Sequence, residues 1–287
     1  MGTSALQIEA VKGDFGARLT GVDLSAGVSD DLFSEIQDTL HRFGVIFFPG
    51  QELDPESLSG FTRKFGTPDI HHLAEHTFPD FPEVRVLSNV KKDGKLVGQF
   101  NGGHYWHSDL SYLPETGYVT ILFGVECPPV GAETLFADMR AVYDSLPDET
   151  IKKIEGKTAI HDRNFRYSDL YPERPPLTPE QIAKVPPAPH PAVRTHPETG
   201  RKSVFLVKEM VSHIGELDEK ASRVLLEDVE AIMERDQFIY SHKWEAGDLV
   251  IWDNRCTLHT ATGYDAAKYR RTLYRTQVKG DAPFYAA

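Results

Sequence analysis

The stretch GDLVIWDNRCTLH, residues 247–259, encodes a strand, a turn and a returning strand in thirteen residues. Residues 249–252 form an apolar run of the kind that fills a buried strand. The polar residues 253–255 follow directly and predict a tight turn, after which residues 256–259 run back. This pattern is typical of antiparallel sheets, and it ends on a histidine, His259.

Other runs have the same strand-like character: GVIFFPG (44–50), GYVTILFGVECPP (117–129), KSVFLVKEM (202–210) and RRTLYRTQV (270–278). Helical periodicity is confined to residues 30–43, with Ser29 or Asp30 as N-cap, to residues 55–65 after Asp54, and to a stretch after Asp218. Many short strands, few peripheral helices and no regular βαβ alternation predict a mainly β sandwich or barrel.

The chain shows no clear domain boundary, and we expect residues 1–287 to form a single domain. One segment stands apart, because eight prolines fall within residues 171–191. Such a segment cannot be a central strand or a continuous helix. Residues 162–191 are therefore expected to form a long excursion, either a lid over a site or a plain surface connection.

Composition narrows the class of protein. A net charge of −12 disfavours binding to nucleic acid or to an acidic membrane surface. Two cysteines are too few for a disulfide framework and suit a reducing compartment. The first residues lack the basic start and apolar core of a signal peptide, and no apolar run approaches bilayer length. These features predict a cytoplasmic protein without a membrane partner, and they leave open a homo-oligomer such as a dimer or tetramer.

Two His-x-acid pairs occur, His107/Asp109 and His196/Glu198, and about two are expected by chance from twelve histidines and 43 acidic residues. The second pair lies in HPETG, whose turn residues predict a hairpin tip. The first lies in the aromatic segment YWHSDLSY, where residues i and i+2 of a strand would share a face and aim at one metal ion.

A catalytic metal needs a third ligand, and His259 is the best candidate. Two histidines and one carboxylate make the facial arrangement typical of non-haem Fe(II) oxygenases, which keeps three coordination positions open. The structural alternative is that His259, taken alone, is a packed histidine.

Six blocks together resemble the taurine dioxygenase and phenoxyacetate-herbicide dioxygenase family of Fe(II)- and 2-oxoglutarate-dependent oxygenases. They are WHSDLSY, GAETLFADMRAVYDSLP, HPAVRTHPETGRKSVFL, GDLVIWDNRCTLH, RRTLYR and GDAPFY, in the family's order and at similar spacings. The resemblance extends from about residue 16 almost to the end of the chain. It implies a double-stranded β-helix, a distorted jelly roll, in agreement with the strand-rich pattern.

The resemblance also implies roles for individual residues. His107, Asp109 and His259 match the iron ligands. Thr134 and Arg271 match the residues that bind the far carboxylate of 2-oxoglutarate.

Two further positions match the substrate-binding residues of the family, Arg275 and His71. The register of the arginines depends on one extra residue after His259, so Arg270 is the alternative to Arg271. If residues 271–275 form a strand, Arg271 and Arg275 share a face about 13 Å apart. The alternative is a solvated basic edge.

The activity that the resemblance implies is oxidation of a C–H bond in a small anionic organic substrate, a carboxylate or sulfonate. Fe(II), 2-oxoglutarate and O2 would be required, and succinate and CO2 released. Two other interpretations remain open at this point: a jelly-roll zinc or manganese hydrolase or isomerase with the same ligands, and a non-catalytic small-molecule binding module.

Overall fold

A computed structural model describes residues 6–70, 74–100 and 102–287. Its larger sheet has eight strands in the order β1-β2-β3-β16-β8-β18-β5-β4, antiparallel except between β2 and β3. The strands are Gln7–Lys12 (β1), Phe15–Thr20 (β2), Val45–Phe48 (β3), Thr77–Phe78 (β4), Phe81–Ser88 (β5), Gly117–Glu126 (β8), Leu249–Asp253 (β16) and Thr272–Lys279 (β18).

A smaller sheet completes a distorted jelly roll. It has the order β15-β9-β17, with the strands Ile239–His242 (β15), Thr134–Asp138 (β9) and Thr257–Ala261 (β17). Apolar side chains from both sheets meet in one cluster, in which Phe136 of β9 lies against Trp252 of β16 at 5.3 Å between ring centroids. The turn after Trp252 therefore carries the chain from the larger sheet to the smaller one, as the stretch at residues 247–259 predicts.

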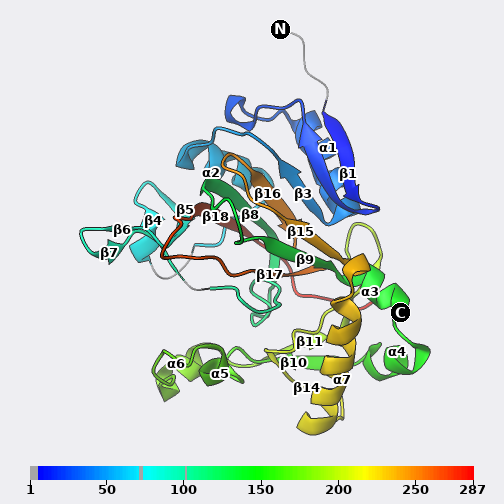
Figure 1. Cartoon of the computed structure of the whole chain (residues 1–287). Coiled ribbons are helices and arrows are strands. Elements are labelled where there is room, and N and C mark those ends of the chain that lie inside the picture. Colours follow the sequence, from blue (N-terminus) through cyan, green and yellow to red (C-terminus); the bar gives the residue numbers. More distant parts are fainter. Residues whose placement is uncertain (1–5, 71–73, 101) are drawn as a thin grey trace.

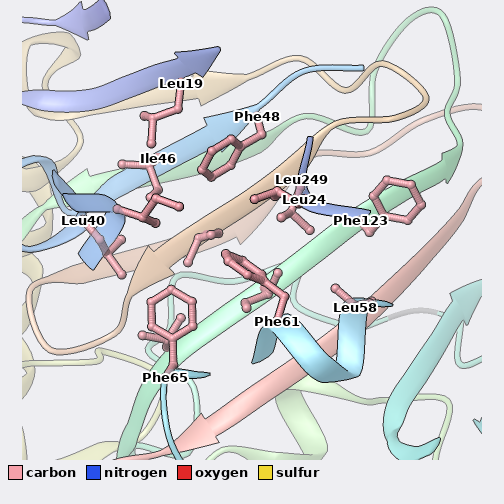
Figure 2. Packing of buried hydrophobic residues seen from close by; sticks show 14 of the residues in the cluster. Leu19, Leu24, Leu40, Ile46, Phe48, Leu58, Phe61, Phe65, Phe123 and Leu249 are labelled. Atoms are coloured by element: carbon pink, nitrogen blue, oxygen red, sulfur yellow. The ribbon is translucent and has the colours of Figure 1, made fainter. Parts of the chain in front are cut away.

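Two helices pack on the larger sheet (Figure 2). α1 (Asp30–Phe43) begins at the N-cap Ser29, and α2 (Pro55–Lys64) begins at Asp54, whose carboxylate accepts a hydrogen bond from the Ser57 amide. Both predicted starts are confirmed, because each depends only on local capping. The cluster between the helices and the sheet takes side chains from both and includes Leu19, Leu40, Ile46, Phe48, Leu58, Phe61, Phe65 and Leu249.

A third group of elements lies beside the jelly roll (Figure 1). Its sheet has the order β11-β10-β14 and its longest helix is α7 (Glu219–Met233), capped by Asp218 as predicted. The other elements are β10 (Thr158–His161), β11 (Ala188–Pro191), β12 (Val193–Thr195), β13 (Lys202–Val204), β14 (Val211–Ile214), α3 (Met139–Ser145) and α4 (Asp148–Ile154), with β6 (Lys91–Lys92), β7 (Lys95–Leu96), η1 (Leu24–Ala26), η2 (Ala74–His76) and η3 (Asp236–Phe238) elsewhere.

The proline-rich excursion holds two short helices, α5 (Tyr167–Leu170) and α6 (Pro179–Lys184), and ends in β11 at a sheet edge. An edge position is where proline is tolerated, so the exclusion of a central strand is confirmed. The expected strand over 202–210 is correct only for Lys202–Val204, because Met210 and Val211 both donate to the Val207 carbonyl and turn the chain. Within the described residues, no helix is both long and apolar enough to cross a membrane.

Candidate active site

His107, Asp109 and His259 lie close together in the folded chain. The Nε2 atom of His107 is 3.9 Å from one Asp109 oxygen, and Nε2 of His259 is 3.7 Å from the other. One ligand atom from each residue lies within 4.8 Å of the other two. Ligand atoms in adjacent positions around one ion, each about 2.1 Å from it, are about 3 Å apart, so a small contraction would coordinate a metal.

The backbone does not bring the three residues together through the one shared strand face that was expected for His107 and Asp109. His259 lies on β17, and His107 forms an isolated bridge to it through two amide–carbonyl hydrogen bonds of 3.0 and 2.8 Å. Asp109 is not on a strand but in a turn, followed by Leu110 with φ of 57°. The expectation that a strand face aligns His107 with Asp109 is therefore wrong, although the two side chains do converge.

Asp109 is held by side chains that the sequence did not single out. Thr120 of β8 donates to its carboxylate at 2.7 Å, and the Asp109 amide donates to Asn254 Oδ1 at 3.1 Å. Asn254 also donates to Thr120 and accepts from the Trp252 indole, at 2.9 and 3.1 Å. These contacts orient one carboxylate oxygen and leave the other free of hydrogen bonds among the described residues.

The protonation states also suit a metal. His107 Nδ1 lies 2.8 Å from the Tyr105 carbonyl, to which it donates, so Nε2 keeps its lone pair. Burial, with the charge of His107, lowers the pKa of His259 to about 3. Burial alone would raise the pKa of Asp109, but His259, Arg275 and His107 hold it below its ordinary value. Neutral imidazoles and an ionised carboxylate are the forms that bind a divalent cation.

A second cluster, His196, Asp253 and Cys256, also has metal-like spacing. The predicted turn at residues 197–200 joins β12 to β13, yet His196 is completely buried and bonds Asp253 at 3.0 Å. Arg255 donates to both Asp253 oxygens, at 2.9 and 2.6 Å. Because donors already occupy this carboxylate, the second cluster fits a structural ion pair better than a metal.

A cavity of about 230 Å³ borders the three candidate ligands. Thr134, Arg271 and Arg275 all line it, as the resemblance implied. Burial lowers the pKa of Arg271, and its Nε has no hydrogen-bond partner among the described residues. Arg270, the alternative, is exposed and pairs with Glu126 at 3.2 Å, outside the cavity lining. His71 lies outside the described residues.

The cavity is also lined by residues that the sequence did not indicate. Arg163 and Tyr171 come from the excursion, and the Arg163 guanidinium lies 5.1 Å from the ring centre of Tyr112. Arg85 of β5 is a fourth arginine in the lining. No local motif marks these residues, since only the packing of distant segments brings them to the cavity.

Comparisons with known proteins agree with this geometry. Residues 7–277 match the family described as taurine catabolism dioxygenase TauD, TfdA family. The chain is 34% identical over 283 residues to the alpha-ketoglutarate-dependent 2,4-dichlorophenoxyacetate dioxygenase of Cupriavidus pinatubonensis, covering 93% of this chain and 96% of that one. It is 31% identical to the alpha-ketoglutarate-dependent sulfate ester dioxygenase of Pseudomonas putida, covering 97% and 91%.

A solved structure has the same fold. The crystal structure of AAD-2 in complex with Mn(II) and N-oxalylglycine superposes with a TM-score of 0.84 at 28% identity, covering 98% of this chain and all of that one.

Proposed function

This chain belongs to the taurine catabolism dioxygenase TauD, TfdA family, and from that premise we propose that it oxidises a C–H bond of a small organic acid. It is a 2-oxoglutarate-dependent non-haem iron dioxygenase, whose reagents are Fe(II), 2-oxoglutarate and O2. The observation that supports the substrate class is that one cavity combines the three candidate ligands with four arginines and no acid besides Asp109 among its described lining residues.

His107, Asp109 and His259 would hold the iron, in the residue order His-x-Asp…His. Together with 2-oxoglutarate, the bound iron would supply O2 activation, in which one oxygen atom would be inserted into the substrate C–H bond and the other would end in succinate, with release of CO2. The chain's own part is to keep the His259 imidazole neutral and to fix the carboxylate through Thr120 and Asn254.

Thr134 and Arg271 would bind the distal carboxylate of 2-oxoglutarate. A guanidinium matches a carboxylate with two parallel hydrogen bonds, and the buried, unpartnered Nε of Arg271 leaves that capacity open. Thr134 is buried at the start of β9, where its hydroxyl accepts a hydrogen bond from the Trp244 indole at 3.0 Å and can donate its own proton to an anion.

Arg275 would bind the anionic group of the organic substrate, with His71 as a second candidate. Residues 162–191 would act as a lid, since Arg163 and Tyr171 of this segment line the cavity. The whole chain, residues 1–287, would form a single oxygenase domain. A hydrolase or isomerase with the same three ligands would have no use for a second carboxylate site at Thr134 and Arg271, nor would a binding module need open metal positions.

The test is succinate formation from 2-oxoglutarate by Fe(II)-loaded enzyme in air. Phenoxyacetates, alkyl sulfate esters, sulfonates and amino acids are compared with their neutral amide or ester analogues. We expect at least one acid to raise succinate formation tenfold or more over the substrate-free rate, and its neutral analogue to have little effect. Equal stimulation by a neutral analogue, or none by any acid, would contradict the proposal.

A further inference from the structure

Arg85 and Arg275 occupy directly opposite positions in the larger sheet. They are register partners between the antiparallel strands β5 and β18, and Leu122 of β8 is the next residue in the same row. All three line the cavity beside the candidate ligands. Two guanidinium groups from strands far apart in the sequence therefore face one small space.

In the part of the chain that the structure describes, the one counter-charge shown to act on this pair is the Asp109 carboxylate, which lies beyond ion-pair distance and whose pKa Arg275 helps to lower. Within the described residues, neither arginine makes an ion pair. Only 6% of Arg85 is exposed, and its Nε atom is buried without a hydrogen-bond partner. The acid on the same strand, Glu83, accepts instead from Ser59 and Arg63, at 2.5 and 2.6 Å.

Such an arrangement is unfavourable by itself. Like charges directly opposite each other destabilise a sheet, and a buried guanidinium needs acceptors for its fixed fork of donors. Burial and the charge of Arg275 lower the pKa of Arg85 only to about 10, so Arg85 stays cationic at neutral pH. An anion with several oxygen acceptors would remove the repulsion and satisfy the open donors at the same time.

We propose that Arg85 and Arg275 form a two-guanidinium clamp that binds one oxyanion head group of the organic substrate. This inference rests on the proposed function, which assigns the other anion in the cavity, the distal carboxylate of 2-oxoglutarate, to Thr134 and Arg271. The ligand class is a carboxylate or sulfate head group with at least two terminal oxygens. Neutral analogues are rejected because they would leave the buried Arg85 and the half-buried Arg275 without an acceptor.

Binding is tested without turnover on enzyme loaded with Mn(II) and N-oxalylglycine. The probes are 2,4-dichlorophenoxyacetate, its amide, hexyl sulfate and inorganic sulfate. Inorganic sulfate tests anion binding at the two arginines even if the cavity fits no organic probe. In calorimetric titrations we expect Arg85→Gln and Arg275→Gln each to raise the dissociation constant of the acid or of sulfate at least tenfold. Arg85→Lys should raise it less. Arg18→Gln, an exposed arginine on β2, is the matched control and should change nothing.

Two further measurements separate a clamp from a structural role. Ligand-free Arg85→Gln should melt at the wild-type temperature or above it, because one of two repelling charges is gone, and its KM for 2-oxoglutarate should be unchanged. A lower melting temperature with wild-type anion binding would make Arg85 structural, and a raised KM for 2-oxoglutarate would assign it to the cosubstrate. If wild type binds none of the anions, the clamp is wrong, whereas turnover of neutral substrates alone overturns the proposed function.

Discussion

At the scale of single residues, the proposed iron site depends on His107, because its two ring nitrogens would have separate tasks. Nδ1 donates to the Tyr105 carbonyl, so Nε2 faces the Asp109 carboxylate with a free lone pair. The backbone of His107 also bridges to that of His259, which sets the distance between the two imidazoles. Losing the side chain removes one ligand and leaves the bridge in place.

We therefore expect His107→Ala to fold normally, to lose stoichiometric Fe(II) binding and to lower turnover at least a thousandfold. Anaerobic Fe(II) titration and succinate assays measure both effects. His213→Ala, at an exposed position on β14, is the control and should bind iron fully. His196→Ala should also bind iron but be less stable, because its partner Asp253 is buried. Full activity in His107→Ala would refute the ligand assignment.

At the scale of one element, the entry to β18 decides which arginine lines the cavity, where we propose that the cosubstrate binds. Arg270 and Arg271 are neighbours at the entry to the strand, so their side chains diverge, one to the Glu126 carboxylate at the surface and one into the cavity. The Arg271 amide donates to Asn89 at 2.8 Å, which holds the strand entry in this register. A shift of one residue would exchange the two side chains.

The expected consequence is that Arg271→Leu raises the KM for 2-oxoglutarate at least a hundredfold, since a charge-assisted contact to a carboxylate is lost. Arg270→Leu is the matched control and should leave this KM within about twofold of the wild-type value, because an exposed ion pair contributes little. The measurement is the dependence of the initial rate on 2-oxoglutarate concentration. An opposite ranking of the two variants would place Arg270 at the cosubstrate.

At the scale of the whole molecule, Asp253 joins parts of the chain that are distant in sequence. It ends β16, pairs with His196 of the β12–β13 hairpin and accepts from Arg255, which also reaches Glu198 at 2.9 Å. Burial would raise the pKa of Asp253, but Arg255 and His196 hold it below the ordinary value of 3.8. The charged network therefore stabilises the folded chain at neutral pH.

Removing this charge should destabilise the protein without altering the ligand set. We expect Asp253→Asn to lower the free energy of unfolding by about 3–5 kcal/mol at pH 7, because it leaves the largely buried Arg255 with less counter-charge. The difference should shrink as the pH falls below about 4, where the unfolded wild-type chain takes up the proton first. Urea unfolding of the wild type and the variant at pH 7 and pH 3 measures the loss of stability and its dependence on pH. Asp228→Asn, at an exposed position, is the control. A difference independent of pH would exclude the ion-pair explanation.

The sequence alone determined the features that depend on neighbours along the chain. Ser29, Asp54 and Asp218 cap their helices through amides three residues away, and residues 249–253 form a strand because apolar and β-branched side chains follow one another. Residue type and order, read against a known family, were enough to nominate His107, Asp109 and His259. The roles of these residues stay predictions until metal binding is measured.

Only the tertiary structure decided how those residues meet. The turn at Asp109, the support from Thr120 and Asn254, and the position of Arg85 opposite Arg275 each join segments far apart in the sequence. Strand register across such separations is set by the burial of whole faces and by bulges, and no local pattern records it. For this reason residue order could nominate the metal ligands, whereas the charge facing the substrate appears only once β5 lies beside β18.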